Sequence, residues 1–167
     1  MVNREDIQYR VGQQFKNPDG TIKGASFLVY IDARTAMREL DELYPKDWSF
    51  DWEYIQGEVG VHGRLTVQNR TYGDVGYPNQ TKVNEMGDGS GEWLKDAVSD
   101  ALKRCAVHVG IGRELYDAPF LYTSELNLAV GNRKIKGFDP LTDMGKKKIE
   151  GDIDKWFNGL SRIKMSK

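Results

Sequence analysis

The chain has 167 residues, the length of one ordinary domain, and its 39% hydrophobic and 29% charged residues are typical of a globular protein. No apolar run approaches the roughly 20 residues that a transmembrane helix needs. The charged start of the chain lacks the apolar segment of a signal peptide, and the single cysteine, Cys105, excludes an intramolecular disulfide. We therefore expect a single cytoplasmic domain over residues 1–167.

The net charge is −1, from 24 Lys and Arg residues against 25 Asp and Glu residues. This balance excludes a protein coated in positive charge, such as a histone-like DNA binder. It does not exclude a local basic groove, because phosphate binding depends on where the cations lie.

A strand and a helix are predicted first. Residues 25–31 (ASFLVYI) form a short run of apolar, β-branched and aromatic residues, which predicts a strand. Asp32 can cap the helix that follows, since apolar residues recur every three or four positions from Ala33 to Tyr44. Pro45 ends this helix.

The next segment is predicted to form an antiparallel meander. Residues 48–54 alternate between aromatic and polar side chains, the period-two pattern of a half-buried strand. After a break at 57–60, further strands are expected at 61–68 and 71–77, joined by a tight turn at Asn69 and Arg70. The meander then has one aromatic face and one polar face.

Two further helices complete the predicted fold. Apolar residues from 93 to 109 form a wide stripe at helical spacing, and glycines at 110 and 112 are expected to end this long helix. It should lie across the aromatic face of the meander, because each would otherwise expose an apolar surface. A last helix is expected from residues 146–148 onwards. The predicted fold class is α+β: an antiparallel β-meander packed against a long helix, with an additional C-terminal helix.

The sequence argues against nucleotide hydrolysis and against a zinc site. The glycine-rich segment 87–91 (GDGSG) lacks the Gly-Lys-Ser/Thr ending that binds phosphate and magnesium. Cys105 and His108 have a spacing that can share a metal, but a structural zinc site needs about four ligands, and His62 is the only other histidine. We expect Cys105 in the core, His108 at a helix end, and neither a metal nor another cofactor.

Carboxylates on the long helix leave one enzymatic alternative open. Asp96 and Asp100 lie one turn apart, and Asp74 lies on a strand, so a metal-dependent nuclease could use them. Arg104 follows Asp100 by four residues, which makes an ion pair on the helix surface the simpler interpretation. Apart from this alternative, we predict no catalytic residue.

The remaining signal is a set of cations on polar faces. Lys95 and Lys103 lie on one line along the long helix, and Arg104 follows Lys103. Further cations are expected on the polar side of the meander, at its hairpin and on the first helix: Arg64, Arg70, Arg34 and Arg38. With Tyr72 or Tyr77 to stack on bases, they could line a groove for a single strand. Ordinary ion pairs on a solvated surface are the other interpretation, and composition does not decide between the two.

Four segments, in the same order and with similar spacing, resemble a known family. Residues 70–77 (RTYGDVGY) resemble the family's hairpin and its Asp-Val-Gly-Tyr segment. Residues 95–106 (KDAVSDALKRCA) resemble its helix with the sequence Glu-Ala-Val-Thr-Asp-Gly-Leu-Lys-Arg-Ala. Residues 110–117 (GIGRELYD) are similar to its glycine-rich turn, and residues 30–32 and 42–44 (YID, ELY) to its opening strand and helix. The chain thus resembles the single-strand annealing proteins of the Rad52/Rad22 type, in the prokaryotic and phage branch of DdrA-like and Sak-like proteins.

This resemblance carries expectations about fold and function. It covers roughly residues 26–121 and implies a β-β-β-α core, so we expect an annealing and DNA-binding core at 25–121 and a C-terminal extension at 122–167. It implies binding of single-stranded DNA and annealing of complementary strands without ATP, in recombination and double-strand-break repair. An oligomeric module that protects strands or binds proteins, without annealing, is the alternative.

The resemblance also implies partners and a location. A homo-oligomer in the form of a ring or an arc is expected, with single-stranded DNA as its ligand and no membrane partner. A single-strand-binding protein or a recombinase is a further candidate partner. The expected location is the cytoplasm, at the nucleoid for a cellular protein or in the host for a phage-encoded one.

Residue by residue, Lys103 and Arg104 match the family's adjacent Lys-Arg pair, which the resemblance implies contacts the backbone of the bound strand. The family's next arginine falls on Val107, so one expected contact is missing. The arginine that opens the family's first helix aligns with Thr35, so Arg34 can replace it only if the register shifts or if its side chain reaches the strand. Expected geometry alone makes candidates of the other cations: Lys95, Arg64, Arg70 and Lys82.

Overall fold

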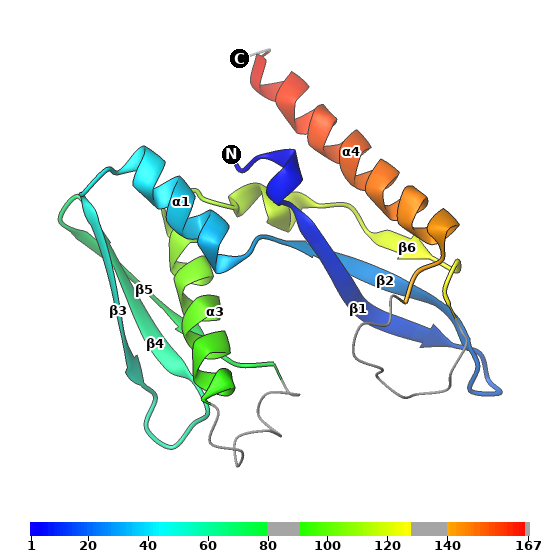
Figure 1. Cartoon of the computed structure of the whole chain (residues 1–167), viewed down its shortest axis with the longest axis horizontal. Helices are drawn as coiled ribbons and strands as arrows, with labels where there is room; N and C mark the ends of the chain where they lie inside the picture. Colours follow the sequence, from blue (N-terminus) through cyan, green and yellow to red (C-terminus); the bar gives the residue numbers. More distant parts are fainter. Residues whose placement is uncertain (80–90, 128–139, 166–167) are drawn as a thin grey trace. The chain divides into compact units, whose positions relative to one another are not determined.

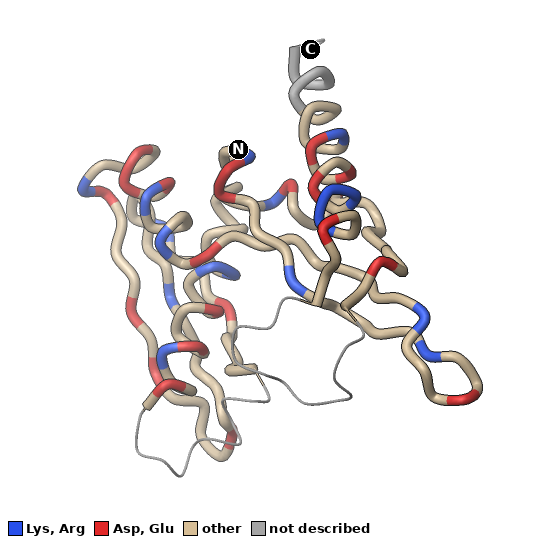
Figure 2. The backbone as a smooth tube through the Cα atoms, turned by 45° about the vertical axis from the view of Figure 1, so that its right-hand side comes forward, with Lys and Arg blue, Asp and Glu red and all other residues tan. Residues whose placement is uncertain are grey.

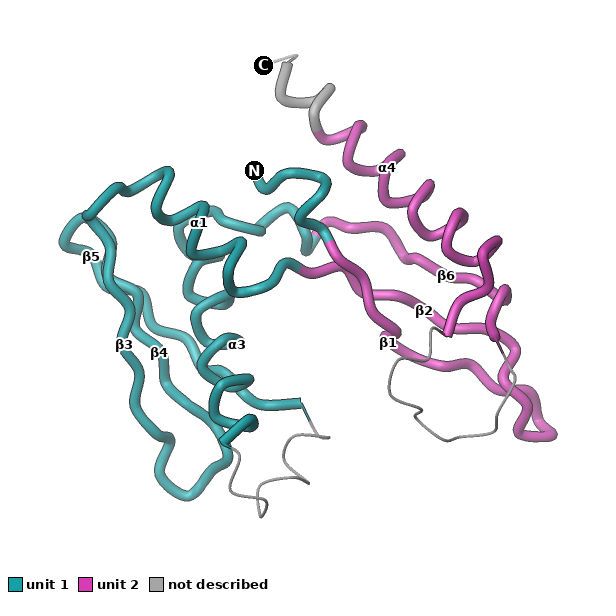
Figure 3. Tube along the Cα trace, viewed as in Figure 1, with its two compact units in different colours: residues 1–7, 31–116 teal, residues 8–30, 117–167 magenta. Residues whose placement is uncertain are grey.

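The computed structural model describes residues 1–79, 91–127 and 140–165, with side chains up to residue 160. The chain forms two compact units, residues 1–7 with 31–116 and residues 8–30 with 117–167 (Figure 3). Each unit contains a three-stranded antiparallel sheet with a helix against it (Figure 1). The predicted α+β class is therefore confirmed, whereas a single domain with a core at 25–121 and an extension at 122–167 stays a prediction.

The first unit contains the predicted meander. Strands β3 (Trp48–Tyr54), β4 (Val61–Val67) and β5 (Arg70–Gly76) pair antiparallel in that order. Every second residue of β4 is buried, beginning with Val61 and including Leu65. This alternation follows from the pleat, which sends neighbouring side chains to opposite faces.

The turn of the hairpin lies one residue earlier than predicted. Gln68 and Asn69 have positive φ angles of 48° and 65°, whereas Arg70 already pairs with Val67 in the ladder. Positive φ at both central positions is the type I′ geometry that matches the twist of the flanking strands. Asn tolerates this backbone conformation better than Arg does, so the turn centres on Gln68 and Asn69 and leaves Arg70 in β5.

Helix α3 (Glu92–His108) packs on the predicted face of this sheet, against β4 and β5. Ala97 and Ala101 are fully buried and form a core cluster with Val61. Trp52 and Tyr54, on β3, are 36% and 58% exposed. The aromatic face is therefore covered over β4 and β5 and stays partly open along β3.

Gly76 allows the backbone of α3 to lie directly against β5. It is buried, and a Cβ atom there would collide with the carbonyl oxygen of Ala97 and with the backbone of Ala101. Only a residue without a side chain fits, so the alanine face of α3 and Gly76 form one close contact.

Helix α1 (Ala33–Leu43) completes the first unit by packing on α3. The Asp32 carboxylate accepts a hydrogen bond from the Thr35 backbone N–H at 2.7 Å, which confirms the predicted cap. Ala36 and Leu40 are fully buried on the same face. Short 3₁₀ turns lie at η1 (Arg4–Asp6) and η3 (Arg113–Asp117).

The second unit contains a sheet that the sequence predicted only in part. Its strands β1 (Gln8–Lys16), β2 (Ile22–Tyr30) and β6 (Leu121–Thr123) pair antiparallel in the order β1-β2-β6. The predicted strand at 25–31 corresponds to β2. The register of β1 slips between Val11 and Gln14, where an extra residue breaks the alternation that would have identified this strand. With three residues, β6 is too short for a periodic signal.

Helix α4 (Asp143–Met165) packs on β6 and begins earlier than predicted. Ile149 and Ile153 are fully buried on its apolar side. Among the residues that the structure describes, no helix has both the length and the apolar character needed to cross a bilayer.

Replacing Gly76 with alanine should lower the free energy of unfolding by about 1–3 kcal/mol, because the new methyl group would force α3 away from β5. Urea denaturation followed by circular dichroism measures the change. Gly151→Ala on α4 is the matched control: a Cβ there meets open space, so this helical substitution should be neutral or stabilising by up to about 1 kcal/mol. Equal stability of Gly76→Ala and the wild type would contradict the close packing of α3.

Candidate nucleic-acid interface

The two faces of α3 have different chemistry. Ala101 and Cys105 are buried toward the sheet, whereas the side chain of Arg104 is 48% exposed and Lys103 is half-buried. Figure 2 shows basic and acidic residues interspersed along the helices of the first unit. Because the buried face fixes the rotation of the helix, it also fixes which charges face solvent.

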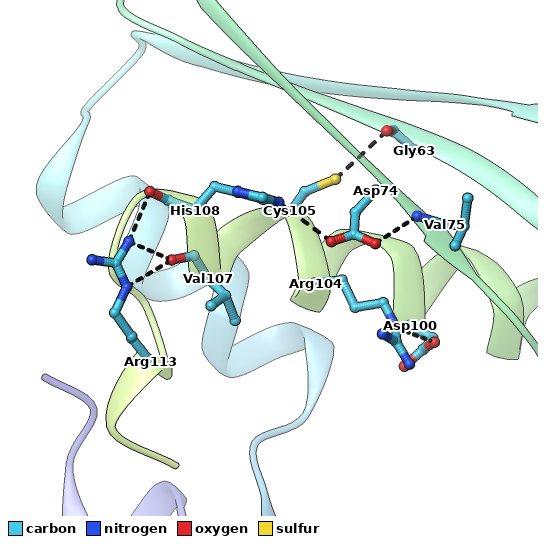
Figure 4. A network of polar contacts seen from close by, with 9 residues as sticks. All are labelled: Gly63, Asp74, Val75, Asp100, Arg104, Cys105, Val107, His108 and Arg113. Carbon is cyan, nitrogen blue, oxygen red and sulfur yellow. Dashed lines mark hydrogen bonds and ion pairs between the residues drawn. The ribbon is translucent and has the colours of Figure 1, made fainter. Parts of the chain in front are cut away.

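Arg104 forms the ion pair that its spacing predicted. Its Nε donates a hydrogen bond to Oδ2 of Asp100 at 2.9 Å, and this bond raises the pKa of the Arg104 guanidinium above its usual value. The same carboxylate oxygen accepts the backbone N–H of Tyr77, the residue that follows β5, at 3.3 Å. Figure 4 shows Arg104 and Asp100 beside each other, apart from the contact between Cys105 and Gly63.

The other two cations of α3 differ in whether a carboxylate balances their charge. In the described part of the chain, Lys103 makes no ion pair or hydrogen bond through its ammonium group. Lys95, two turns earlier, pairs with Glu92 at 2.9 Å, although its side chain is 73% exposed. Among the cations of this helix, Lys103 is therefore the one without a carboxylate partner in the described residues.

Arg64 lies on the opposite face of the sheet from α3. The register pairs it with Asp51, and Arg64 binds both Asp51 and Glu53 at 2.8 Å. The hydrogen bond to Asp51 is the main cause of the raised pKa of Arg64. The structure does not bring Arg64 together with Lys103 and Arg104, and two carboxylates already balance its charge.

The remaining predicted cations lie elsewhere in the first unit. Arg70 is exposed at the hairpin end of β5, and Arg34 is exposed in the first turn of α1. Thr35, where the resemblance predicts the family's arginine, is only 5% exposed, so Arg34 is the cation that this turn presents to solvent. Arg38 binds Asp6, and this hydrogen bond lowers the pKa of the Asp6 carboxyl. Lys82 lies outside the described residues.

Both tyrosines that were expected to stack on bases have partners within the protein. The ring of Tyr72 stacks on His108, with centroids 5.9 Å apart and planes at 14°. The hydroxyl of Tyr77 donates to Glu58 at 2.8 Å, which raises the pKa of Tyr77. Tyr77 is nevertheless 45% exposed, so part of its ring faces solvent.

Cys105 lies in the core and His108 lies at the end of α3, as predicted. The thiol of Cys105 donates to the Gly63 carbonyl at 3.6 Å, and burial raises its pKa. Nε2 of His108 lies 3.3 Å from Oδ2 of Asp74. Within the described residues, no three His, Cys, Asp or Glu side chains lie together as a metal site would require.

Arg113 is a cation near this surface that sequence reasoning missed. Its guanidinium donates to the Val107 carbonyl at 3.0 and 3.3 Å and to the His108 carbonyl at 3.0 Å. These are carbonyls of the last turn of α3, which have no partner within the helix. The signal available in the sequence is a basic residue directly after the glycines that end the helix.

Comparison with known proteins places this arrangement in a family. The model of the Rad52/22 family of double-strand break repair proteins matches residues 1–130. The single-stranded DNA-binding protein DdrA of Deinococcus radiodurans is 42% identical over 125 residues, which cover 68% of this chain and 56% of that protein. The protein of the same name from Deinococcus deserti is 45% identical over 97 residues, which cover 57% of this chain and 44% of that protein. No solved structure matches the chain.

The matched segments span about half the length of these two relatives. The family match, by contrast, includes the whole first unit and the sheet of the second unit, and it ends before α4. The order of strands, the long helix and its Lys103–Arg104 pair lie within the matched residues. The chain therefore belongs to the Rad52/22 family of double-strand break repair proteins.

Proposed function

We propose that this protein binds single-stranded DNA through the exposed side of α3 and anneals complementary strands without ATP, in recombination and double-strand-break repair. Membership of a break-repair family supports this proposal, as do two relatives that are named single-stranded DNA-binding proteins. The observation that carries it is the pair of adjacent cations, Lys103 and Arg104, on the outer side of a helix whose other side is fixed in the core.

Annealing imposes two requirements that conflict in free DNA. The two backbones must approach each other despite their repulsion, while the bases stay accessible for pairing. Cations that bind one backbone reduce the repulsion by replacing counterions, and they leave the base edges open. Such contacts carry no sequence preference, so base pairing selects the partner strand. No catalytic residue, metal or nucleotide is needed for this activity.

A homo-oligomer would make these weak contacts effective. The main contacts proposed for each protomer are two adjacent cations, of which Arg104 is paired with a carboxylate, so the affinity of one protomer for a strand should be modest. Repeating the same surface in a ring or an arc converts modest affinity into avidity. A net charge of −1 is compatible with this arrangement because the acidic residues can face away from the strand.

The weighting of the candidate cations follows from the family resemblance and then from their partners. We assign the main contacts to Lys103 and Arg104 because they match the adjacent Lys-Arg pair that the resemblance implies. We place Arg34 and Arg70 second because both are exposed without a carboxylate partner in the described part of the chain. Lys95 has a single carboxylate partner, whereas Arg64 has two. Arg64 should therefore contribute least.

Substituting both Lys103 and Arg104 with alanine should weaken binding of a labelled oligothymidylate by about tenfold at low salt, because two phosphate contacts are lost. Fluorescence anisotropy over a range of salt concentrations measures this effect. The remaining binding should also depend less on salt, since fewer counterions are released.

The matched control removes two exposed lysines of the second unit, Lys16 and Lys23, and so changes the net charge equally. Its affinity should stay within about twofold of the wild type. If both double variants lose affinity alike, the loss reports net charge, and the assignment of Lys103 and Arg104 is wrong.

Pairing of two complementary oligonucleotides should be faster with the protein than without it, in the presence of a chelator and without ATP. Quenching between dyes on the two strands follows the rate. Slower pairing would indicate a strand-protecting protein, and no DNA binding at all would indicate an interaction module. Shortening of labelled DNA on addition of magnesium would indicate the nuclease, which nothing in the structure or the comparisons supports.

A further inference from the structure

One oxygen of Asp100 binds two donors at once. Oδ2 accepts a hydrogen bond from Nε of Arg104 at 2.9 Å and from the backbone N–H of Tyr77 at 3.3 Å. The Asp100 side chain is 29% exposed, so it lies at the surface beside the Arg104 guanidinium (Figure 4). Because a backbone group also holds it, the carboxylate stays in place when Arg104 moves.

A DNA phosphate would compete with this carboxylate for Arg104. Guanidinium groups bind carboxylates and phosphates through the same fork of N–H donors, and Asp100 already occupies Nε. A phosphate that binds the edge of the guanidinium containing Nε must therefore displace or share this donor, whereas one that binds the remaining N–H groups lies next to the carboxylate. Since the carboxylate remains next to Tyr77, its negative charge stays close to the incoming phosphate.

The negative charge of Asp74 also raises the pKa of the Arg104 guanidinium, but the oxygens of Asp74 have different partners. Oδ1 accepts the backbone N–H of Val75 at 2.8 Å, and Oδ2 lies 3.3 Å from His108. Asp100 is therefore the direct competitor for the guanidinium.

We propose that Asp100 is a positioning residue that competes with DNA phosphate for Arg104 and so holds the affinity of each protomer for a strand below what its cations alone would give. This inference rests on the function proposed above. Lys103 gives the strand a contact that needs no exchange of partners, whereas the contact with Arg104 is exchangeable. An exchangeable contact allows the bound strand to shift until its bases align with those of the complementary strand.

Asp96 provides a matched control for Asp100. It lies one turn earlier on α3 and accepts a backbone N–H in the same way, from Asn79 at 2.7 Å. In the described part of the chain, however, Asp96 has no ion pair with a cation. Substitution of either residue by asparagine changes the net charge equally and keeps an oxygen acceptor for the backbone, so only Asp100→Asn removes a negative charge that is paired with Arg104.

Asp100→Asn should bind a labelled oligothymidylate about two- to fivefold more tightly than the wild type at low salt, the change expected for loss of an exposed ion-pair competitor. The plot of log affinity against log salt should also become steeper, by about 0.7. In the wild type, a phosphate that binds Arg104 releases a counterion from the DNA, but the displaced Asp100 carboxylate binds a cation from solution in turn. In Asp100→Asn only the release from the DNA remains. A purely structural role of Asp100 would not change this slope. Asp96→Asn should leave the slope unchanged and affect affinity by less than about twofold.

The same pair of substitutions in an Arg104→Ala background completes the test. There, Asp100→Asn and Asp96→Asn should bind alike, because the cation for which Asp100 competes is gone. Thermal unfolding checks the fold, and if Asp100→Asn melts early, Asp100→Ser replaces it with the same expected steepening. Equal effects of Asp100→Asn and Asp96→Asn in the wild-type background would overturn the inference but leave DNA binding intact. Absence of DNA binding by the wild type would instead overturn the proposed function.

Discussion

The contact between the backbones of α3 and β5 determines what the first unit presents to solvent. Gly76 provides no side chain, and Ala97 and Ala101 provide only methyl groups, so the helix rests directly on the sheet. Such close packing permits one rotation of the helix about its axis. With Ala101 turned inward, Lys103 and Arg104 are carried to the outer side. The predicted DNA surface is thus a consequence of core packing, although none of its charges belongs to the core.

Charge compensation separates cations that look equivalent in the sequence. Arg64 binds two carboxylates, Arg104 binds one, and Lys103 binds none within the described residues. Each carboxylate stabilises the charged guanidinium but also lowers the attraction that remains for a phosphate. A net charge near zero can therefore coexist with a DNA surface when compensation is uneven.

The family match and the two units divide the chain at different places. The match runs over residues 1–130 and so includes β1, β2 and β6, whereas α4 lies beyond it. Ile149 and Ile153 of α4 are nevertheless fully buried, so this helix is an integral part of the second unit. Helix α4 thus belongs to the folded second unit although it lies outside the residues that match the family.

The sequence by itself determined every element whose residues repeat with a regular period, including the three strands of the meander, α1, α3 and the presence of α4. It also determined the ion pair between Asp100 and Arg104, because residues four apart on a helix are neighbours. Only the tertiary structure decided the partners that are distant in sequence: the pairing of β2 with β1 and β6, the contact of His108 with Asp74, and the two carboxylates around Arg64. Periodicity gives the face on which a residue lies. It does not give the register between strands or the seating of a helix on a sheet, which depend on the fit of side chains from separate segments.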